Sequence, residues 1–111
     1  MQGGIEWLVD ARGCAPARLR DRATIAALLD RIVAAMDLHV VTTAVHVFGG
    51  AGGITAMYLL AESHLTIHTF PEAGTATLNA YCCRPRAAAA WRDVFALVEA
   101  RDVEVREVSR G

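Results

Sequence analysis

The sequence contains no lysine, since all eleven of its basic residues are arginine. Without a lysine amine the chain cannot hold pyridoxal phosphate as an internal aldimine, and it cannot form a Walker-type phosphate-binding loop. Any carbonyl chemistry in this protein therefore needs an electrophile from another source.

An excess of charge of either sign is also missing. The 111 residues include 12 acidic and 11 basic ones, which leaves no long-range field to attract nucleic acid. Hydrophobic residues make up 54% of the chain, which favours a folded protein over a disordered one. The N-terminus has no basic segment, and glycine, threonine and histidine interrupt the uncharged stretches, so we expect neither a secretory signal nor a membrane span. These features predict a cytoplasmic protein without a nucleic-acid or membrane partner.

Cysteine is scarce, with Cys14, Cys82 and the adjacent Cys83 as its only occurrences. Their number is odd, and no pair has the two-residue spacing of a zinc knuckle or a redox motif. We therefore expect three reduced thiols and no metal.

The length predicts one domain over residues 1–111. Strands are expected at 5–9, 39–48, 54–60, 65–70, 74–81 and 103–108, with the glycine-rich residues 49–53 as a loose hairpin loop. One helix is expected from the N-cap Thr24 to about residue 37, because apolar residues recur there every three or four positions. A second helix is expected to open at Pro85 and to bury Trp91, Val94, Phe95 and Val98. This pattern predicts an α+β two-layer sandwich, a largely antiparallel sheet with two helices packed on one face.

Reactive side chains are concentrated between residues 61 and 72. This stretch holds a hydroxyl group, two imidazoles and two carboxylates in a segment otherwise suited to a strand. Polar groups at that density are costly to bury unless each one is hydrogen-bonded. The stretch is therefore interpreted as a functional site.

The same stretch resembles the hallmark of the prokaryotic, pyruvoyl-dependent S-adenosylmethionine decarboxylase proenzymes, Glu-Ser-His-Leu-Ser/Thr-Ile-His-Thr-Trp-Pro-Glu. Here it reads Glu62-Ser63-His64-Leu65-Thr66-Ile67-His68-Thr69-Phe70-Pro71-Glu72. The similarity covers essentially the whole chain, and its flanking matches are His46 and Phe48 before the glycine loop, Gly53-Ile54-Thr55 after it, Cys83, and the closing Arg110-Gly111.

The resemblance implies that the chain cleaves itself between Glu62 and Ser63, giving a β chain of residues 1–62 and an α chain of residues 63–111. In the family, the serine hydroxyl attacks the preceding carbonyl, and elimination from the resulting ester leaves a pyruvoyl group at the new N-terminus. Thr55 corresponds to a serine that assists this processing. His68 corresponds to the histidine that removes the Cα proton, a role suited to an imidazole.

The resemblance also implies roles after cleavage. The pyruvoyl group derived from Ser63 forms a Schiff base with the substrate amine and accepts the electrons released with carbon dioxide. Cys83 matches the cysteine that returns a proton to the substrate. Phe48 and Phe70 are expected to contact the adenine or the sulfonium, and Glu72 the ribose hydroxyls. The family also implies a homodimer and a place in polyamine (spermidine) biosynthesis.

Several alternatives remain open at this stage. The chain differs from the family pattern at Phe70 in place of tryptophan and at Asn79 in place of aspartate, and related enzymes act on L-ornithine or L-arginine. An unprocessed binding or regulatory homologue is the third reading. Glu62, His64 and His68 share one strand parity, which makes a metal site geometrically possible, but the processing motif already accounts for them.

Overall fold

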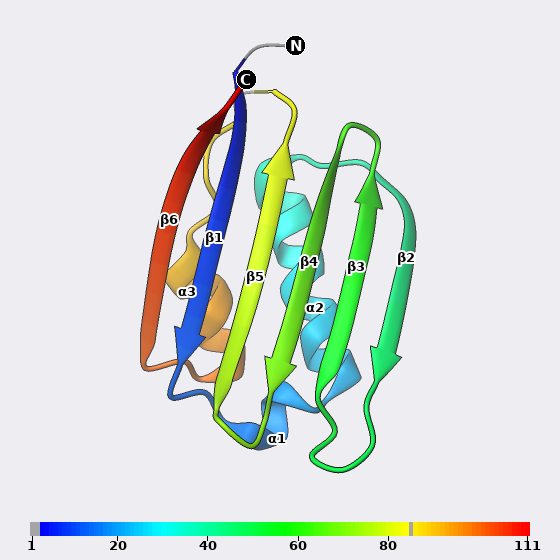
Figure 1. Cartoon of the computed structure of the whole chain (residues 1–111), viewed down its shortest axis with the longest axis vertical. Helices are drawn as coiled ribbons and strands as arrows, with labels where there is room; N and C mark the ends of the chain where they lie inside the picture. Colours follow the sequence, from blue (N-terminus) through cyan, green and yellow to red (C-terminus); the bar gives the residue numbers. More distant parts are fainter. Residues whose placement is uncertain (1–2, 85) are drawn as a thin grey trace.

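The computed structural model describes residues 3–84 and 86–111. Its six strands form one antiparallel sheet in the order β2-β3-β4-β5-β1-β6, and the helices lie together on one face of it (Figure 1). This arrangement confirms the predicted α+β sandwich. The strands are β1 (Gly4–Arg12), β2 (Val40–Val47), β3 (Ile54–Leu60), β4 (Ser63–Phe70), β5 (Thr75–Cys82) and β6 (Asp102–Arg110). The helices are α1 (Pro16–Leu19), α2 (Arg22–Met36), α3 (Trp91–Phe95) and the 3-10 helix η1 (Ala96–Val98).

Strand alternation gives the sheet two different faces. In β1 the side chains of Trp7, Val9 and Ala11 are buried under the helices, and in β4 those of Leu65 and Ile67 are. The intervening positions point to the opposite face, which no helix of the described chain covers (Figure 1). We call this uncovered side the open face.

Helix α2 begins three residues before the predicted start. Its N-cap is Asp21, whose carboxylate accepts hydrogen bonds from the backbone N–H of Thr24 at 3.3 Å and from the Thr24 hydroxyl at 2.6 Å. Thr24 is therefore not the cap but the residue that the cap binds, because Asp competes well for this position. The predicted apolar stripe is confirmed by the buried side chains Ile25, Leu28, Leu29, Ile32 and Met36.

The second predicted helix is shorter than its alanine run suggested. Residues 86–90 are not helical, and α3 begins only at Trp91; the expected opening at Pro85 lies outside the described residues. The Arg86 guanidinium donates to the carbonyls of Met36 and Asp37 at 3.1 and 3.2 Å, and Ala89 is only 7% exposed. These contacts hold the segment across the end of α2 and outweigh the helix propensity of alanine.

Buried hydrogen bonds of Thr69 connect β4 to the start of β3 and to α1 at one end of the sheet. The buried Thr69 hydroxyl accepts from the N–H of Ile54 at 2.9 Å and donates to the carbonyl of Leu19 at 2.8 Å. A Cβ atom at Gly53 would lie 2.7 Å from the carbonyl oxygen of Thr69, so glycine alone fits there. This close approach places Thr55 beside β4.

Candidate active site

The predicted catalytic residues lie at two ends of β4. Ser63 opens the strand, and His68 comes five residues later, roughly 17 Å away at the usual rise per residue. The two side chains also have opposite parity: Ser63 shares the side of Leu65 and Ile67, whereas His68 is on the open face. A single chain therefore does not bring Ser63 and His68 together.

At the first end, Ser63 lies beside two consecutive cysteines at the end of β5. The backbone N–H of Cys83 donates to the Ser63 hydroxyl oxygen at 3.2 Å, and Ser63 pairs across the sheet with Cys82. Burial raises the pKa of the Cys82 thiol, which also shares a side-chain hydrogen bond with Ser63. Cys83 is half-buried and contacts Tyr81, and a hydrogen bond with Cys83 raises the pKa of that tyrosine. The serine hydroxyl and the Cys83 residue are thus neighbours.

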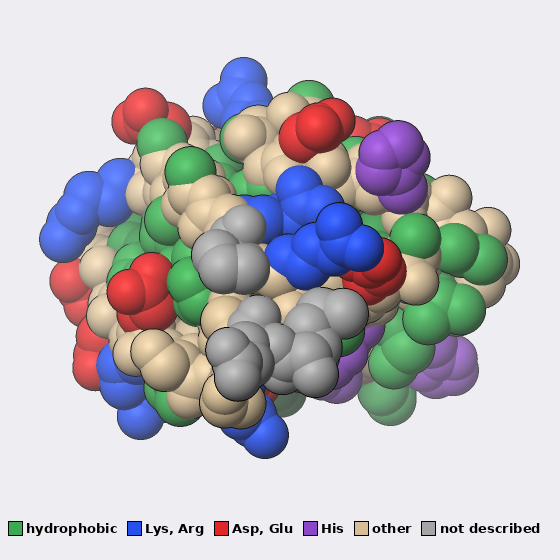
Figure 2. Space-filling model, turned by 90° about the horizontal axis from the view of Figure 1, so that it is seen from above, with side chains coloured by type: hydrophobic (Ala, Val, Ile, Leu, Met, Phe, Trp, Pro, Cys, Tyr) green, Lys and Arg blue, Asp and Glu red, His purple; other side chains and the backbone are tan. Residues whose placement is uncertain are grey.

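Glu62, the residue before Ser63, forms an ion pair with Arg84, which follows β5. The Glu62 carboxylate receives Nη2 of Arg84 at 2.8 Å on one oxygen and Nε at 2.7 Å on the other, a two-point ion pair. Glu62 and Ser63 line a pocket of about 260 Å³ together with Arg84 and Arg86. Figure 2 looks onto this end of the sheet and shows arginine side chains gathered beside an acidic one. Glu62 and Ser63 are thus both accessible and both fixed.

The other end brings five predicted residues into one pocket. The Thr55 hydroxyl and Nδ1 of His68 are 2.9 Å apart, and the two residues face each other across β3 and β4. A pocket of about 270 Å³ is lined by both of these residues and by Phe48, Phe70 and Glu72. The two phenylalanine side chains are 53% and 41% exposed, so their ring faces are available to a ligand.

A polar hollow on the open face lies between the Ser63 end and the His68 end of β4, since both His64 and His68 line it. It measures about 360 Å³, and His64, His68 and Asn79 are among its lining residues. Asn79 donates to Glu6 at 2.7 Å, and this bond holds the pKa of Glu6 below its usual value. The amide oxygen of Asn79 is buried and has no partner within the described chain. The open face therefore carries polar groups that a covering surface could satisfy.

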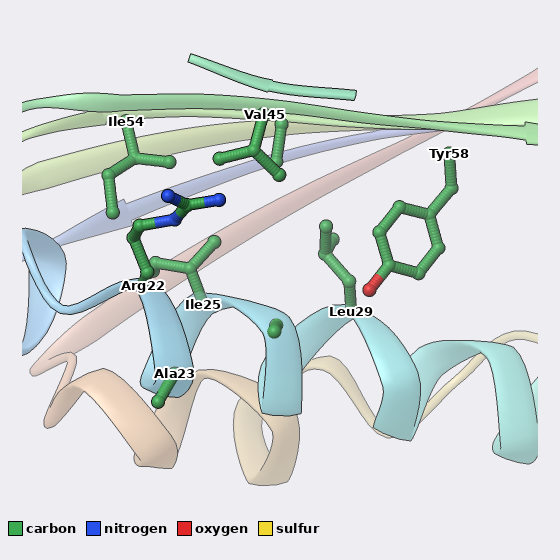
Figure 3. Close-up of a pocket in the computed structure, with 9 residues that line it drawn as sticks. Arg22, Ala23, Ile25, Leu29, Val45, Ile54 and Tyr58 are labelled. Atoms are coloured by element: carbon green, nitrogen blue, oxygen red, sulfur yellow. The ribbon is translucent and has the colours of Figure 1, made fainter. Parts of the chain in front are cut away.

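A further pocket, on the helix side, is a different kind of space. Figure 3 shows Arg22 reaching from α2 toward Ile54 and Val45, with Tyr58 at the far end. Tyr58 donates to Asp30 at 2.8 Å, and burial together with this carboxylate raises its pKa to about 12. The pocket lining, all within the described residues, includes none of the predicted site residues.

In residues 3–84 and 86–111, no three histidine, cysteine or acidic side chains lie close enough together to hold a metal ion. Glu62 pairs with Arg84 rather than with His64 or His68. None of the helices in this part of the chain is long and apolar enough to cross a membrane.

Sequence reasoning missed three residues at the Ser63 end, namely Cys82, Arg84 and Arg86. The β4–β5 register pairs Ser63 with Cys82, and Arg84 and Arg86 line the pocket that Glu62 and Ser63 share. The turn at residues 71–74 fixes this register, so counting outward from it would have found Cys82 and Arg84. No sequence signal indicated the contact between Arg86 and the end of α2.

Comparison with known proteins gives consistent results. A family model described as S-adenosylmethionine decarboxylase matches residues 5–111. An S-adenosylmethionine decarboxylase proenzyme from Pyrobaculum islandicum is 35% identical over a stretch covering 64% of this chain and 57% of that relative. One from Clostridium botulinum is 30% identical, covering 97% of this chain and 94% of the relative. The crystal structure of the adenosylmethionine decarboxylase from Aquifex aeolicus has a TM-score of 0.81 and 27% identity, covering 99% of this chain and 92% of that one.

Proposed function

The chain belongs to the S-adenosylmethionine decarboxylase family, and on that basis we propose that it cleaves its own Glu62–Ser63 bond and then decarboxylates S-adenosylmethionine. The observation that carries this proposal is the fixed position of both residues of that bond. Cys83 holds the Ser63 hydroxyl, and Arg84 holds the Glu62 side chain. The decarboxylated product is a donor of aminopropyl groups for polyamine synthesis.

The proposed cleavage follows from the chemistry of these side chains. The Ser63 hydroxyl attacks the Glu62 carbonyl carbon, and the amide becomes an ester with a free amine on residue 63. A base then removes the Cα proton of residue 63, the Cβ–Oγ bond breaks, and Glu62 leaves as a carboxylate. Water hydrolyses the remaining enamine, releases ammonia and leaves a pyruvoyl group on residue 63. The half-buried, strand-opening position of Ser63 in an open pocket leaves room for this group.

We assign the role of this base to His68, and to Thr55 the role of orienting the His68 imidazole. The hydrogen bond between Thr55 and His68 orients the imidazole, as a partner on one ring nitrogen does in general. His68 is too far along β4 to reach Ser63 of the same chain. We therefore propose a homodimer in which His68 of one protomer serves Ser63 of its partner.

The open face is the surface proposed for this dimer. Two sheets packed face to face lie about 10 Å apart, close enough for side chains from both to form one site. An antiparallel arrangement sets the Ser63 end of one sheet over the His68 end of the other. The partner's His68 would then face the backbone of residue 63, whose Cα proton it removes, while the Ser63 side chain lies on the helix side. Large apolar side chains exposed on this face favour such burial; they are Met57, Leu59, Phe70 and Val108.

We predict that the dimer has composite sites, and co-expression of two variants tests this. Sedimentation at micromolar concentration is expected to give about twice the protomer mass. When Ser63→Ala and His68→Ala chains are co-expressed, the His68→Ala chain is expected to be cut, because its intact Ser63 meets the intact His68 of its partner. Each variant expressed alone stays whole. An uncut His68→Ala chain in proven heterodimers, or an active monomer, contradicts the composite site.

After cleavage, a pyruvoyl group supplies the carbonyl that accepts the electrons released with carbon dioxide. The chain's own residues would perform the remaining tasks. Cys83, beside Ser63, would return a proton to the substrate carbon. In the composite site, the partner's Phe48 and the partner's Phe70 would offer ring faces to the adenine or the sulfonium, and the partner's Glu72 would offer a carboxylate to the ribose hydroxyls, because all three line the His68 pocket.

We predict S-adenosylmethionine as the substrate because the pocket combines two aromatic rings with one carboxylate. A short basic amino acid needs a carboxylate for its distal cation and no aromatic clamp. The test compares kcat/KM for S-adenosylmethionine, L-ornithine and L-arginine on one processed preparation. S-adenosylmethionine is expected to be turned over and the amino acids are not. If either amino acid is turned over and S-adenosylmethionine is not, the predicted substrate is wrong, but the proposed cleavage chemistry is not contradicted.

A further inference from the structure

Arg84 forms its ion pair at the one peptide bond that the proposed reaction breaks. Its guanidinium contacts both carboxylate oxygens of Glu62, at 2.8 and 2.7 Å, while the adjacent Cys83 N–H contacts the Ser63 hydroxyl. Two consecutive residues after β5 therefore hold the two sides of the scissile bond. We propose that Arg84 is a positioning residue for self-cleavage, which neutralises the Glu62 side chain so that a second carboxylate can form on the same residue. This inference rests on the proposed function.

The charge balance of the cleavage explains why such a residue is needed. Elimination breaks the Cβ–Oγ bond, and the electron pair stays on the former ester oxygen, so the main chain of Glu62 becomes a carboxylate. Glu62 then carries two negative charges a few ångströms apart. Preorganised positive charge stabilises such a developing anion. The Arg84 guanidinium already lies against the Glu62 carboxylate before the reaction begins, and Arg86 lines the same pocket.

The ion pair itself contributes little to folding. The side chains of Arg84 and Glu62 are 62% and 40% exposed, and exposed pairs of this kind stabilise proteins only weakly. Substitution of Arg84 is therefore expected to leave the melting temperature unchanged. Any effect on the rate of cleavage then reports on the reaction.

The test is a time course of chain cleavage in purified variants, followed by mass spectrometry. Arg84→Ala is expected to slow cleavage about tenfold, an effect between those that two like charges a few ångströms apart have in bulk water and at a protein surface. The ester is expected to accumulate, so hydroxylamine cuts the Arg84→Ala chain and leaves an α chain that starts with serine. Arg84→Lys keeps the charge and is expected to cleave near the wild-type rate.

Removal of the second charge provides the decisive variant. Glu62→Gln in the Arg84→Ala background is expected to restore the cleavage rate, because no side-chain carboxylate then opposes the new one. The matched control is Arg18→Ala, which removes an exposed ion pair with Glu99 at the far end of the molecule and leaves cleavage unchanged. Wild-type cleavage in Arg84→Ala, no hydroxylamine-sensitive ester, or no restoration by Glu62→Gln would overturn the proposal. Failure of the wild-type chain to cleave would instead reject the proposed function.

Discussion

The Ser63→Ala chain is expected to stay whole and to release no carbon dioxide from S-adenosylmethionine. Alanine has no hydroxyl to attack the Glu62 carbonyl, so neither the ester nor the pyruvoyl group can form. The loss is complete rather than partial, because no other hydroxyl lies in the pocket that Glu62 and Ser63 line within the described chain. Intact mass and carbon dioxide release measure the two effects.

The chain offers a matched control for this variant. Its other serine, Ser109, lies exposed near the end of β6, and Ser109→Ala is expected to cleave and turn over like the wild type. Cleavage of the Ser63→Ala chain between residues 62 and 63 would show that the serine hydroxyl is not the nucleophile.

Cys83→Ala is expected to cleave but to lose turnover by about 10²- to 10⁴-fold, the range typical of a general acid. Cys83 binds Ser63 through its backbone N–H, which alanine retains, whereas the thiol contacts Tyr81 on the other side. The variant therefore separates processing from decarboxylation. Single-turnover carbon dioxide release on fully cleaved protein is the measurement.

Cys14→Ala is the control for Cys83→Ala. Cys14 is a free thiol buried away from Ser63, so its removal is expected to leave both cleavage and turnover intact. Full turnover by Cys83→Ala would reject its role as proton donor. A loss found in Cys82→Ala and absent from Cys83→Ala would transfer the role to the neighbouring buried thiol.

Local sequence patterns predicted the strands and the buried stripe of α2 better than they predicted where the helices begin. Alternating strands and the stripe of α2 depend on periodicity, which the sequence displays directly. The two errors have different causes. Asp21 rather than Thr24 caps α2 through a contact only three residues long, so this error came from choosing the wrong one of two nearby capping residues. Arg86 holds the alanine run in a non-helical path through a tertiary contact with the end of α2, which no local pattern displays.

The residues proposed for the site come from the sequence motif, whereas their arrangement in two groups comes from the structure. Strand parity alone places Ser63 and His68 on opposite faces. The proposal of a composite site rests on the distance between Ser63 and His68 along β4. That distance was not predictable, because β4 was expected to start at residue 65 and Ser63 to lie outside it. The ion pair between Arg84 and Glu62 follows from the β4–β5 register, which the turn at residues 71–74 fixes and which the sequence analysis did not use.

The mass of the purified chain after prolonged incubation tests self-cleavage most directly. We predict two species, residues 1–62 and residues 63–111, with the second resistant to Edman sequencing because a pyruvoyl group has no amine. A single intact chain of 111 residues would contradict the account and favour an unprocessed binding or regulatory homologue.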